Sequence, residues 1–175
     1  MNARWEKCVE FHGHACPGLA IGFRAVEAAQ TWLGMQGFSA DEELVCVTEN
    51  DACGVDAIQV LLGCSFGKGN LIYKDVGKQA FSFFDRKGGK KGRVVFRRPL
   101  DPAMDRTAMQ AHILEAPLEE VFELKTPSFE LPKPARLFTS LACEVCGESA
   151  AEIKMRLQEG KKVCADCFSH YTRGF

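Results

Sequence analysis

Four cysteines near the C-terminal end of the chain have the spacing of metal ligands. They form two Cys-x-x-Cys pairs, Cys143 with Cys146 and Cys164 with Cys167. Each pair can hold one edge of a metal ion, and zinc prefers four thiolate sulfurs arranged as a tetrahedron. Because four protein ligands leave no coordination position for a substrate, the pattern predicts a structural zinc finger over residues 141–175.

The residues around these pairs predict how the finger folds. Gly147 permits the tight turn of a zinc knuckle after the first pair, and the sequence of residues 168–171 after the second pair favours a helix. A knuckle followed by a ligand-bearing helix is typical of a treble clef. Two redox dithiols or four buried cysteines are the alternatives, and the paired spacing makes them the weaker interpretation.

A second group of histidines and cysteines lies near the N-terminal end. His12, His14 and Cys16 alternate along the chain, so an extended backbone would present all three on one side, an arrangement that can hold a metal ion. Cys16 and Cys53 each precede an expected helix, whose N-terminal N–H groups and dipole favour a thiolate. His14, Cys16 and Cys53 would together suit zinc, nickel or iron, with a fourth position open as catalytic metal sites require.

Other interpretations of this second group stay open. In an enzyme, Cys16 would be a thiolate nucleophile or metal ligand, His14 a ligand or general base, and Asp56 an orienting carboxylate. Alternatively, each His or Cys is an ordinary packed side chain, as we expect of Cys8 and Cys46 among their apolar neighbours. Spacing alone does not decide between chemistry and packing.

The stretch of residues 63–69, Gly-Cys-Ser-Phe-Gly-Lys-Gly, is an incomplete phosphate-binding loop. It is one residue short, lacks Ser or Thr after Lys68, and follows an expected helix where a strand is required. Nucleotide hydrolysis is therefore excluded. The glycines and Lys68 could still form a small anion nest, so Lys68 and Cys64 are kept as candidates for cofactor binding.

Basic residues are concentrated in one other stretch of the chain. Residues 86–98 hold seven basic residues and no acidic residue, but they cross an expected hairpin turn, where a solvated charged tip is the simpler explanation. From Cys143 to Phe175 there are five basic and five acidic residues, which makes the finger a poor reader of phosphate. A nucleic-acid-binding regulator is therefore the least favoured hypothesis.

The composition is that of a folded protein with one domain and a small appendage. The chain has 175 residues, of which 46% are hydrophobic and 26% charged, with a net charge of −1. No stretch approaches the roughly 20 apolar residues that span a bilayer, and no apolar segment follows the first residues, so we expect a cytoplasmic protein without a membrane partner. Nine cysteines, an odd number, fit metal binding better than disulfides in such a chain.

The predicted elements must position the ligands. Apolar residues at helical spacing predict helices over 17–33 and 55–62, and a β-branched run predicts a buried strand over 44–48. From residue 70 to residue 100 the apolar pattern changes to period two, which predicts antiparallel strands. Because helices precede the strand cluster without strict alternation, the predicted fold class is α+β, with N-terminal helices and an antiparallel sheet.

A helix over 102–114, capped by Asp101, and a strand over 121–125 complete the expected core. Three prolines follow within eight residues, and proline-rich stretches behave as semi-rigid extended spacers. The predicted domains are a core over residues 1–126, a linker over 127–140 and the finger over 141–175.

Three strings of the core resemble the FmdE family, which takes its name from formylmethanofuran dehydrogenase. The first, residues 11–24, reads Phe-His-Gly-His-Ala-Cys-Pro-Gly-Leu-Ala-Ile-Gly-Phe-Arg. The second is Asp51-x-Cys53-x-x-Asp56-Ala-Ile-Gln, and the third, residues 63–70, is Gly-Cys-x-x-Gly-Lys-Gly-Asn. The resemblance extends from about residue 11 to the expected strands near residue 84, and the four-cysteine finger is similar to an auxiliary finger that some members carry.

The resemblance implies an α+β core that forms a homodimer, a treble-clef finger, and an association with molybdenum or tungsten formylmethanofuran dehydrogenase. It places His14, Cys16 and Cys53 in the core site. The residues that it places beside that site are His12, Asp56, Cys64 and Lys68. On this basis we expect a metal-binding accessory protein, in which the core holds or transfers a transition metal. The finger would contact a partner such as the subunits of a molybdenum or tungsten oxidoreductase.

Overall fold

The computed structural model describes residues 2–35, 37–97 and 103–173. The chain divides into two compact units, Met1–Ala135 and Arg136–Phe175, which are considered one at a time below. Among the helices of the described residues, none combines the length and the apolar character that a bilayer span needs.

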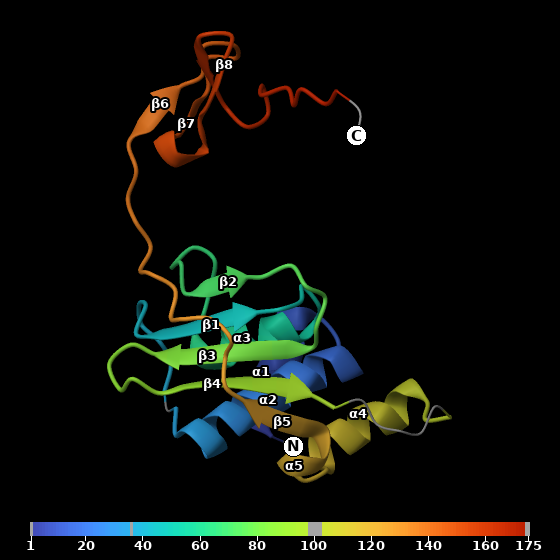
Figure 1. Ribbon diagram of the computed structural model, residues 1–175. Coiled ribbons are helices and arrows are strands. Elements are labelled where there is room, and N and C mark those ends of the chain that lie inside the picture. Colours follow the sequence, from blue (N-terminus) through green and yellow to red (C-terminus); the bar gives the residue numbers. More distant parts are fainter. Residues whose placement is uncertain (1, 36, 98–102, 174–175) are drawn as a thin grey trace. The chain divides into compact units, whose positions relative to one another are not determined.

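The first unit is a five-stranded sheet with helices against one face (Figure 1). The strand order is β2-β1-β3-β4-β5. The elements of this unit are α1 (Ala3–His12), α2 (Pro17–Leu33), β1 (Leu44–Thr48), α3 (Gly54–Leu62), β2 (Leu71–Tyr73), β3 (Ala80–Asp85), β4 (Lys91–Phe96), α4 (Arg106–Glu115), α5 (Leu118–Val121) and β5 (Phe122–Lys125). The α+β class that we predicted is confirmed.

The structure corrects one detail of the predicted core, which is the pairing of β2. β2 pairs with β1 in parallel, whereas the other neighbouring strands pair antiparallel, so the all-antiparallel prediction is wrong at Leu71–Tyr73. The reason is that α3 lies between β1 and β2 in the sequence and returns the chain to the other end of the sheet, as parallel pairing requires.

Helix α4 is capped by Asp105, whose carboxylate accepts a hydrogen bond from the Ala108 N–H. The cap predicted at Asp101 lies outside the described residues.

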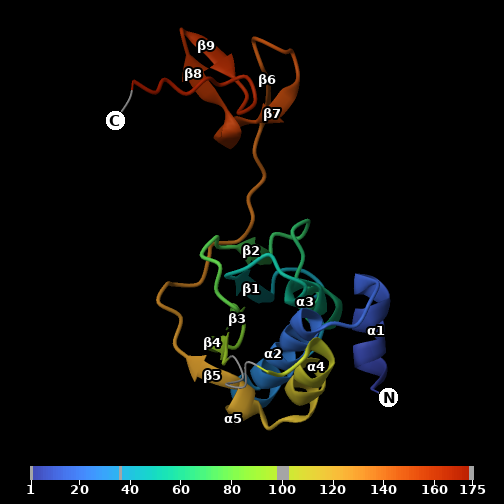
Figure 2. The same cartoon turned by 90° about the vertical axis from the view of Figure 1, so that its right-hand side faces the viewer.

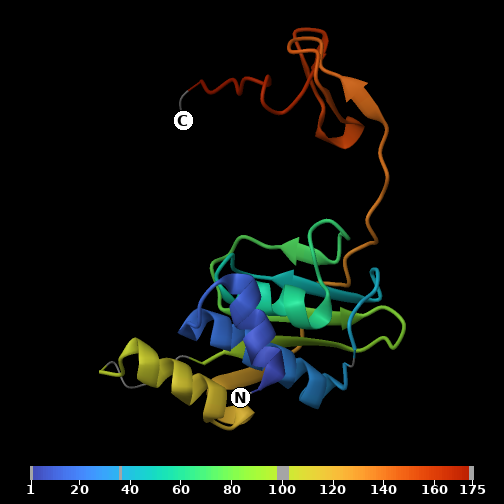
Figure 3. The ribbon, with the colours of Figure 1, turned by 180° about the vertical axis from the view of Figure 1, so that it is seen from behind.

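Helices α2 and α3 pack so closely that only glycine fits between them. A Cβ atom added to Gly22 would lie 1.9 Å from the carbonyl oxygen of Gly54. Gly54 is the first residue of α3, and Cys16 and Cys53 are the residues that precede the two helices. The glycine contact therefore brings the starts of α2 and α3, and with them the two cysteines, close together. Figure 3 shows the face of the sheet that these helices cover.

The other face of the sheet is covered by the segment after β5, which we call the sheet strap and define as residues 127–135 (Figure 2). Phe129 and Leu131 pack against the buried side chains of Val45, Val47 and Phe84. The strap is fixed at its end, where the Ala135 N–H donates to the Glu42 carboxylate at 3.0 Å. The segment that we predicted as linker thus begins with nine residues that belong to the first unit, because their apolar side chains cover an apolar sheet face.

The second unit consists of two short hairpins. Its elements are β6 (Ser140–Ala142), β7 (Ser149–Ala151), the 3-10 helix η1 (Glu152–Lys154), β8 (Arg156–Gln158) and β9 (Lys161–Val163). The helix predicted over 168–171 is wrong, since this stretch is irregular. The four residues 168–171 make about one helical turn, and a helix needs several turns to offset its nucleation cost. Instead, the Ser169 N–H donates to the Gln158 side-chain oxygen at 2.9 Å, which holds the chain extended.

Candidate metal sites

Cys16 occupies the N-cap position of α2. Its backbone is extended, with φ −153°, and its Sγ accepts a hydrogen bond from the Leu19 N–H at 3.3 Å. The side chain is 4% exposed, and Pro17 begins the helix immediately behind it. Unpaired N–H groups and the helix dipole at such a position favour a thiolate, which is the form that binds metal.

His12 is placed opposite this sulfur by the end of α1. The helix ends at His12, and Gly13 takes the left-handed conformation, with φ 89°, so that the chain turns sharply toward Cys16. The His12 and His14 rings lie with their centroids 4.6 Å apart, and the His12 Nε2 is 3.9 Å from the Cys16 Sγ. One ligand atom from each of His12, His14 and Cys16 lies within 4.8 Å of the other two.

Asp56 of α3 orients this cluster. Its Oδ2 is 2.7 Å from the Nδ1 of His12, while its Oδ1 accepts a hydrogen bond from the Gln59 amide at 3.1 Å. A carboxylate that accepts a hydrogen bond from Nδ1–H leaves the Nε2 lone pair free to bind a metal. Such a carboxylate is a common hydrogen-bond partner of metal-binding histidines. His12, His14 and Cys16 therefore form a candidate metal site of two nitrogens and one sulfur, and Asp56 orients one of its ligands.

The set of ligands differs from the set that the sequence suggested. We predicted His14, Cys16 and Cys53, with His12 beside them, whereas the cluster contains His12 and leaves Cys53 outside. Burial and then the hydrogen bond with Cys16 raise the pKa of the Cys53 thiol. Cys53 makes no capping hydrogen bond to α3, so the thiolate argument from the helix start does not hold there. The signal that could have identified His12 is its position at a helix end followed by Gly13.

A hollow of about 470 Å³ opens beside this cluster. Three of its lining residues belong to the site or touch it, namely His12, Cys53 and Asp56. The aromatic side chains of Phe66 and Tyr73 also line it. A small molecule in this hollow would therefore lie next to the candidate metal ligands.

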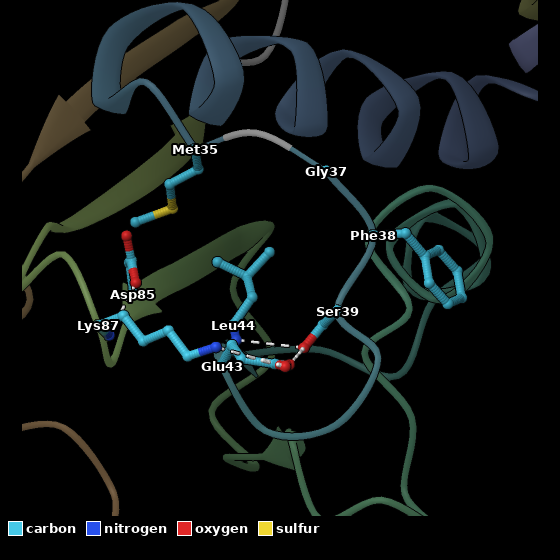
Figure 4. Close-up of a pocket in the computed structure, with 8 residues that line it drawn as sticks. All are labelled: Met35, Gly37, Phe38, Ser39, Glu43, Leu44, Asp85 and Lys87. Carbon is cyan, nitrogen blue, oxygen red and sulfur yellow. Dashed lines mark hydrogen bonds and ion pairs between the residues drawn. The ribbon is translucent and has the colours of Figure 1, made fainter.

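Two residues predicted for cofactor binding lie in another part of the core. The Cys64 thiol is fully buried and donates to the Leu44 carbonyl at 3.6 Å. Lys68 donates to the Ser39 carbonyl, and its Nζ is 5.1 Å from the centroid of the Phe38 ring. Ser39 and Phe38 line a separate hollow of about 330 Å³, in which the Ser39 hydroxyl donates to the Glu43 carboxylate (Figure 4). The His/Cys cluster contributes no lining residue to that hollow.

The four cysteines of the second unit come together as the sequence predicts. The Sγ atoms of Cys143, Cys146, Cys164 and Cys167 all lie within 4.8 Å of one another. Hydrogen bonds from the backbone N–H groups of Cys146, Cys164 and Val145 lower the pKa of the Cys143 thiol to about 6. A thiol that ionises this readily is prepared for metal, and four sulfurs at such distances suit tetrahedral zinc.

Two family models match the chain. The model described as "FmdE, Molybdenum formylmethanofuran dehydrogenase operon" matches residues 11–124, which carry the His/Cys cluster and the whole sheet except the last residue of β5. The model described as "Prokaryotic dksA/traR C4-type zinc finger" matches residues 136–173. The second match covers the unit that contains the four clustered cysteines.

A curated relative and a solved structure are also similar. The relative, from Archaeoglobus fulgidus, is described as "Probable S-adenosyl-L-methionine-binding protein" and is 30% identical over 195 aligned positions, which cover 93% of this chain and 51% of that protein. The chain thus spans about half the length of this relative. A crystal structure described as a "tungsten formylmethanofuran dehydrogenase subunit e (fmde)-like protein", from Syntrophus aciditrophicus, matches with a TM-score of 0.70 and 24% identity. The match covers 93% of this chain and 88% of that one, and it shows a shared fold.

Proposed function

The chain belongs to the FmdE family, and from this premise we propose that it is a metal-binding accessory protein whose core site holds or transfers a transition metal ion. The observation that carries the proposal is the approach of ligand atoms from His12, His14 and Cys16 to within 4.8 Å of one another. The Asp56 carboxylate, 2.7 Å from the Nδ1 of His12, supports it because it fixes the tautomer that ligation needs.

The ligand chemistry narrows the choice of metal. Two imidazole nitrogens and one thiolate suit zinc, nickel or iron and do not suit the hard cations magnesium and calcium, which prefer oxygen. Three protein ligands leave at least one coordination position free, so an ion held here can exchange or meet a further ligand. The finger differs, since its four sulfurs complete the shell of a structural zinc ion.

We extend the proposal to a partner, a molybdenum or tungsten oxidoreductase that the finger contacts. Its support is the description of the matching family, which names a molybdenum formylmethanofuran dehydrogenase operon. The test is a pull-down from the native host with the full chain as bait. Recovery of a molybdenum or tungsten enzyme by the parent, and its loss with Cys143→Ser, is expected. Recovery that is unaffected by Cys143→Ser would remove the finger from the proposal.

We also propose that the chain forms a homodimer. Light scattering on the purified protein, which reports its mass in solution, would check this.

A second candidate function is favoured by one further observation. Cys16, His12 and Asp56 lie in the order sulfur, imidazole and carboxylate, with 3.9 Å from Sγ to Nε2 and 2.7 Å from Nδ1 to Oδ2. This is the order of a thiol enzyme in which the imidazole serves as base and the carboxylate orients it. His12 would then take the role of base that the sequence had suggested for His14.

The deciding experiment is metal analysis of protein purified from cells without added metal. We expect two ions per chain in the parent, loss of the core ion alone in Cys16→Ser, and loss of zinc alone in Cys143→Ser. Cys53→Ser is the matched control, because Cys53 is adjacent to the cluster but outside it, and should retain both ions. A parent with a single zinc ion that only Cys143→Ser removes would end the core-metal proposal and favour the thiol enzyme.

A further inference from the structure

The hollow beside the core site has an uneven distribution of charge. Its lining includes two carboxylates, Asp51 and Asp56, and among the described residues that line it there is no lysine or arginine. Asp56 is engaged by His12 and by Gln59. Asp51 is exposed and lies three residues before α3, and the described lining residues include no lysine or arginine that could pair with it.

The nearest lysine in sequence does not supply that cation. Lys74 follows Tyr73 directly, and successive side chains of an extended chain point to opposite faces. Its Nζ lies 4.6 Å from the centroid of the Phe129 ring, which belongs to the sheet strap on the far face of the sheet. Lys74 therefore does not neutralise the Asp51 carboxylate at the hollow.

Two aromatic rings face solvent at the same place. Phe66 is 66% exposed and Tyr73 is 40% exposed, although both line the hollow. Tyr73 and Asp51 line the same hollow, and the Tyr73 hydroxyl donates a hydrogen bond to Asp75 at 2.9 Å. Aromatic faces beside a carboxylate attract organic cations, because the ring quadrupole and the charge act in the same direction.

A metal ion in the core site would not reverse this preference. A divalent ion, the Cys16 thiolate and the Asp56 carboxylate sum to zero charge, which leaves Asp51 as the carboxylate without a positively charged partner among the described lining residues. From these observations we infer that the hollow binds a small organic cation, with its positive charge facing Asp51 and the rings of Phe66 and Tyr73. The inference rests on the proposed function in one respect only, namely that this cation would be the ligand presented to the core metal.

Three indoles of matched shape test the inference on the full chain. Tryptamine carries a positive charge, tryptophol is its uncharged counterpart, and indole-3-propionate is negative. By isothermal titration calorimetry we expect tryptamine to bind about tenfold more tightly than tryptophol, with indole-3-propionate weaker still. Equal affinity for tryptamine and tryptophol, preference for indole-3-propionate, or no binding of tryptamine at millimolar concentration would overturn the inference.

Charge and ring variants locate the site. Asp51→Asn should lower the affinity for tryptamine about five- to tenfold, whereas Asp41→Asn, which removes an exposed carboxylate elsewhere on the core, should leave it unchanged. Phe66→Leu should lower it several-fold, whereas Phe38→Leu, at a ring of nearly equal exposure beside the other hollow, should not. Affinity for tryptamine that survives both Asp51→Asn and Phe66→Leu would also overturn the inference.

The same measurements separate this inference from the proposed function. In Cys16→Ser without a core metal, charge-selective binding of tryptamine should persist, because Asp51 and the two rings are unchanged. A parent that lacks a core metal but prefers tryptamine to tryptophol would retain the cation site and refute the metal proposal. A parent with two metal ions and no preference would do the reverse.

Discussion

The finger and the core site each gather cysteines, yet they are built in opposite ways. All four ligands of the finger come from two local pairs, in a unit whose buried apolar residues are Cys143, Val163 and Cys164. The candidate ligands of the core site come from the end of one helix, the connection after it and the start of the next helix. Asp56 on a third helix supports them, and these elements pack against a buried sheet. The comparison teaches that the finger, with few buried apolar residues, should depend on its metal to fold, whereas the core brings its candidate ligands together by packing alone.

The largest expected effect follows directly from this difference. Zinc removal by a chelator, or Cys143→Ser, should unfold residues 136–173, since structural zinc supplies on the order of 10 kcal/mol or more to such a unit. The core signals in an NMR spectrum should stay in place while the finger signals collapse to random-coil positions. Cys16→Ser is the counterpart, because it removes a ligand from a packed site and should leave both sets of signals dispersed. A finger that keeps its dispersed signals without zinc would refute the contrast.

The next effect tests whether core packing makes the core site. Gly22→Ala would place a Cβ atom 1.9 Å from the Gly54 carbonyl, a backbone atom that cannot move alone. Helices α2 and α3 must separate, and we expect a loss of about 3 kcal/mol in the free energy of unfolding of the core, at the upper end for overpacking. The core metal should be lost with it while the zinc remains. Gly67→Ala is the control, since no atom lies within 4 Å of an added Cβ there.

A smaller effect is expected when the carboxylate that orients His12 is removed and the packing of the core is left intact. Asp56→Ala removes the acceptor of the His12 Nδ1–H without touching the ligands, so the affinity for the core metal should fall about 10- to 100-fold. A competition titration with a chromogenic chelator would measure it. The zinc of the finger should be unaffected. An unchanged core affinity would mean that Asp56 does not orient the ligand, and the catalytic triad interpretation would weaken too.

The same difference between the two regions explains what the sequence could predict. The finger ligands were predictable because a Cys-x-x-Cys pair encodes its geometry within four residues. The α+β class followed from the change of apolar period near residue 70. His12 was assigned a secondary role because its partnership with Asp56 spans 44 positions and depends on how α1 packs against α3. The helix end before Gly13 is a local signal for His12, but no local pattern reveals its partnership with Asp56.

The errors have the same origin. The parallel pairing of β2 with β1 is decided by where α3 returns the chain, and period two alone is the same for both pairings. The expected helix after Cys167 was judged from four residues, whereas the Gln158 side chain holds Ser169 in another conformation. Lys68 was singled out by neighbouring glycines, and cofactor binding there stays a prediction, because its position near Phe38 and Ser39 is set by the tertiary fold.

The smallest effect concerns the sheet strap, which lies where the core ends and the tether to the finger begins. Phe129→Ala should lower the free energy of unfolding of the core by about 1–2 kcal/mol, less than a fully buried Phe→Ala, because the ring is half-buried against Phe84 with centroids 5.8 Å apart. Leu137→Ala, two residues beyond the strap at a fully exposed side chain, should change it by less than about 0.5 kcal/mol. Denaturant unfolding of the core followed by far-UV circular dichroism would measure both. Equal effects would show that residues 127–135 are a spacer like residues 136–139, which follow them, and the core would then end at β5. A larger effect at Phe129 places the strap within the unit that burial holds together, in contrast with the finger, which we expect zinc to hold together.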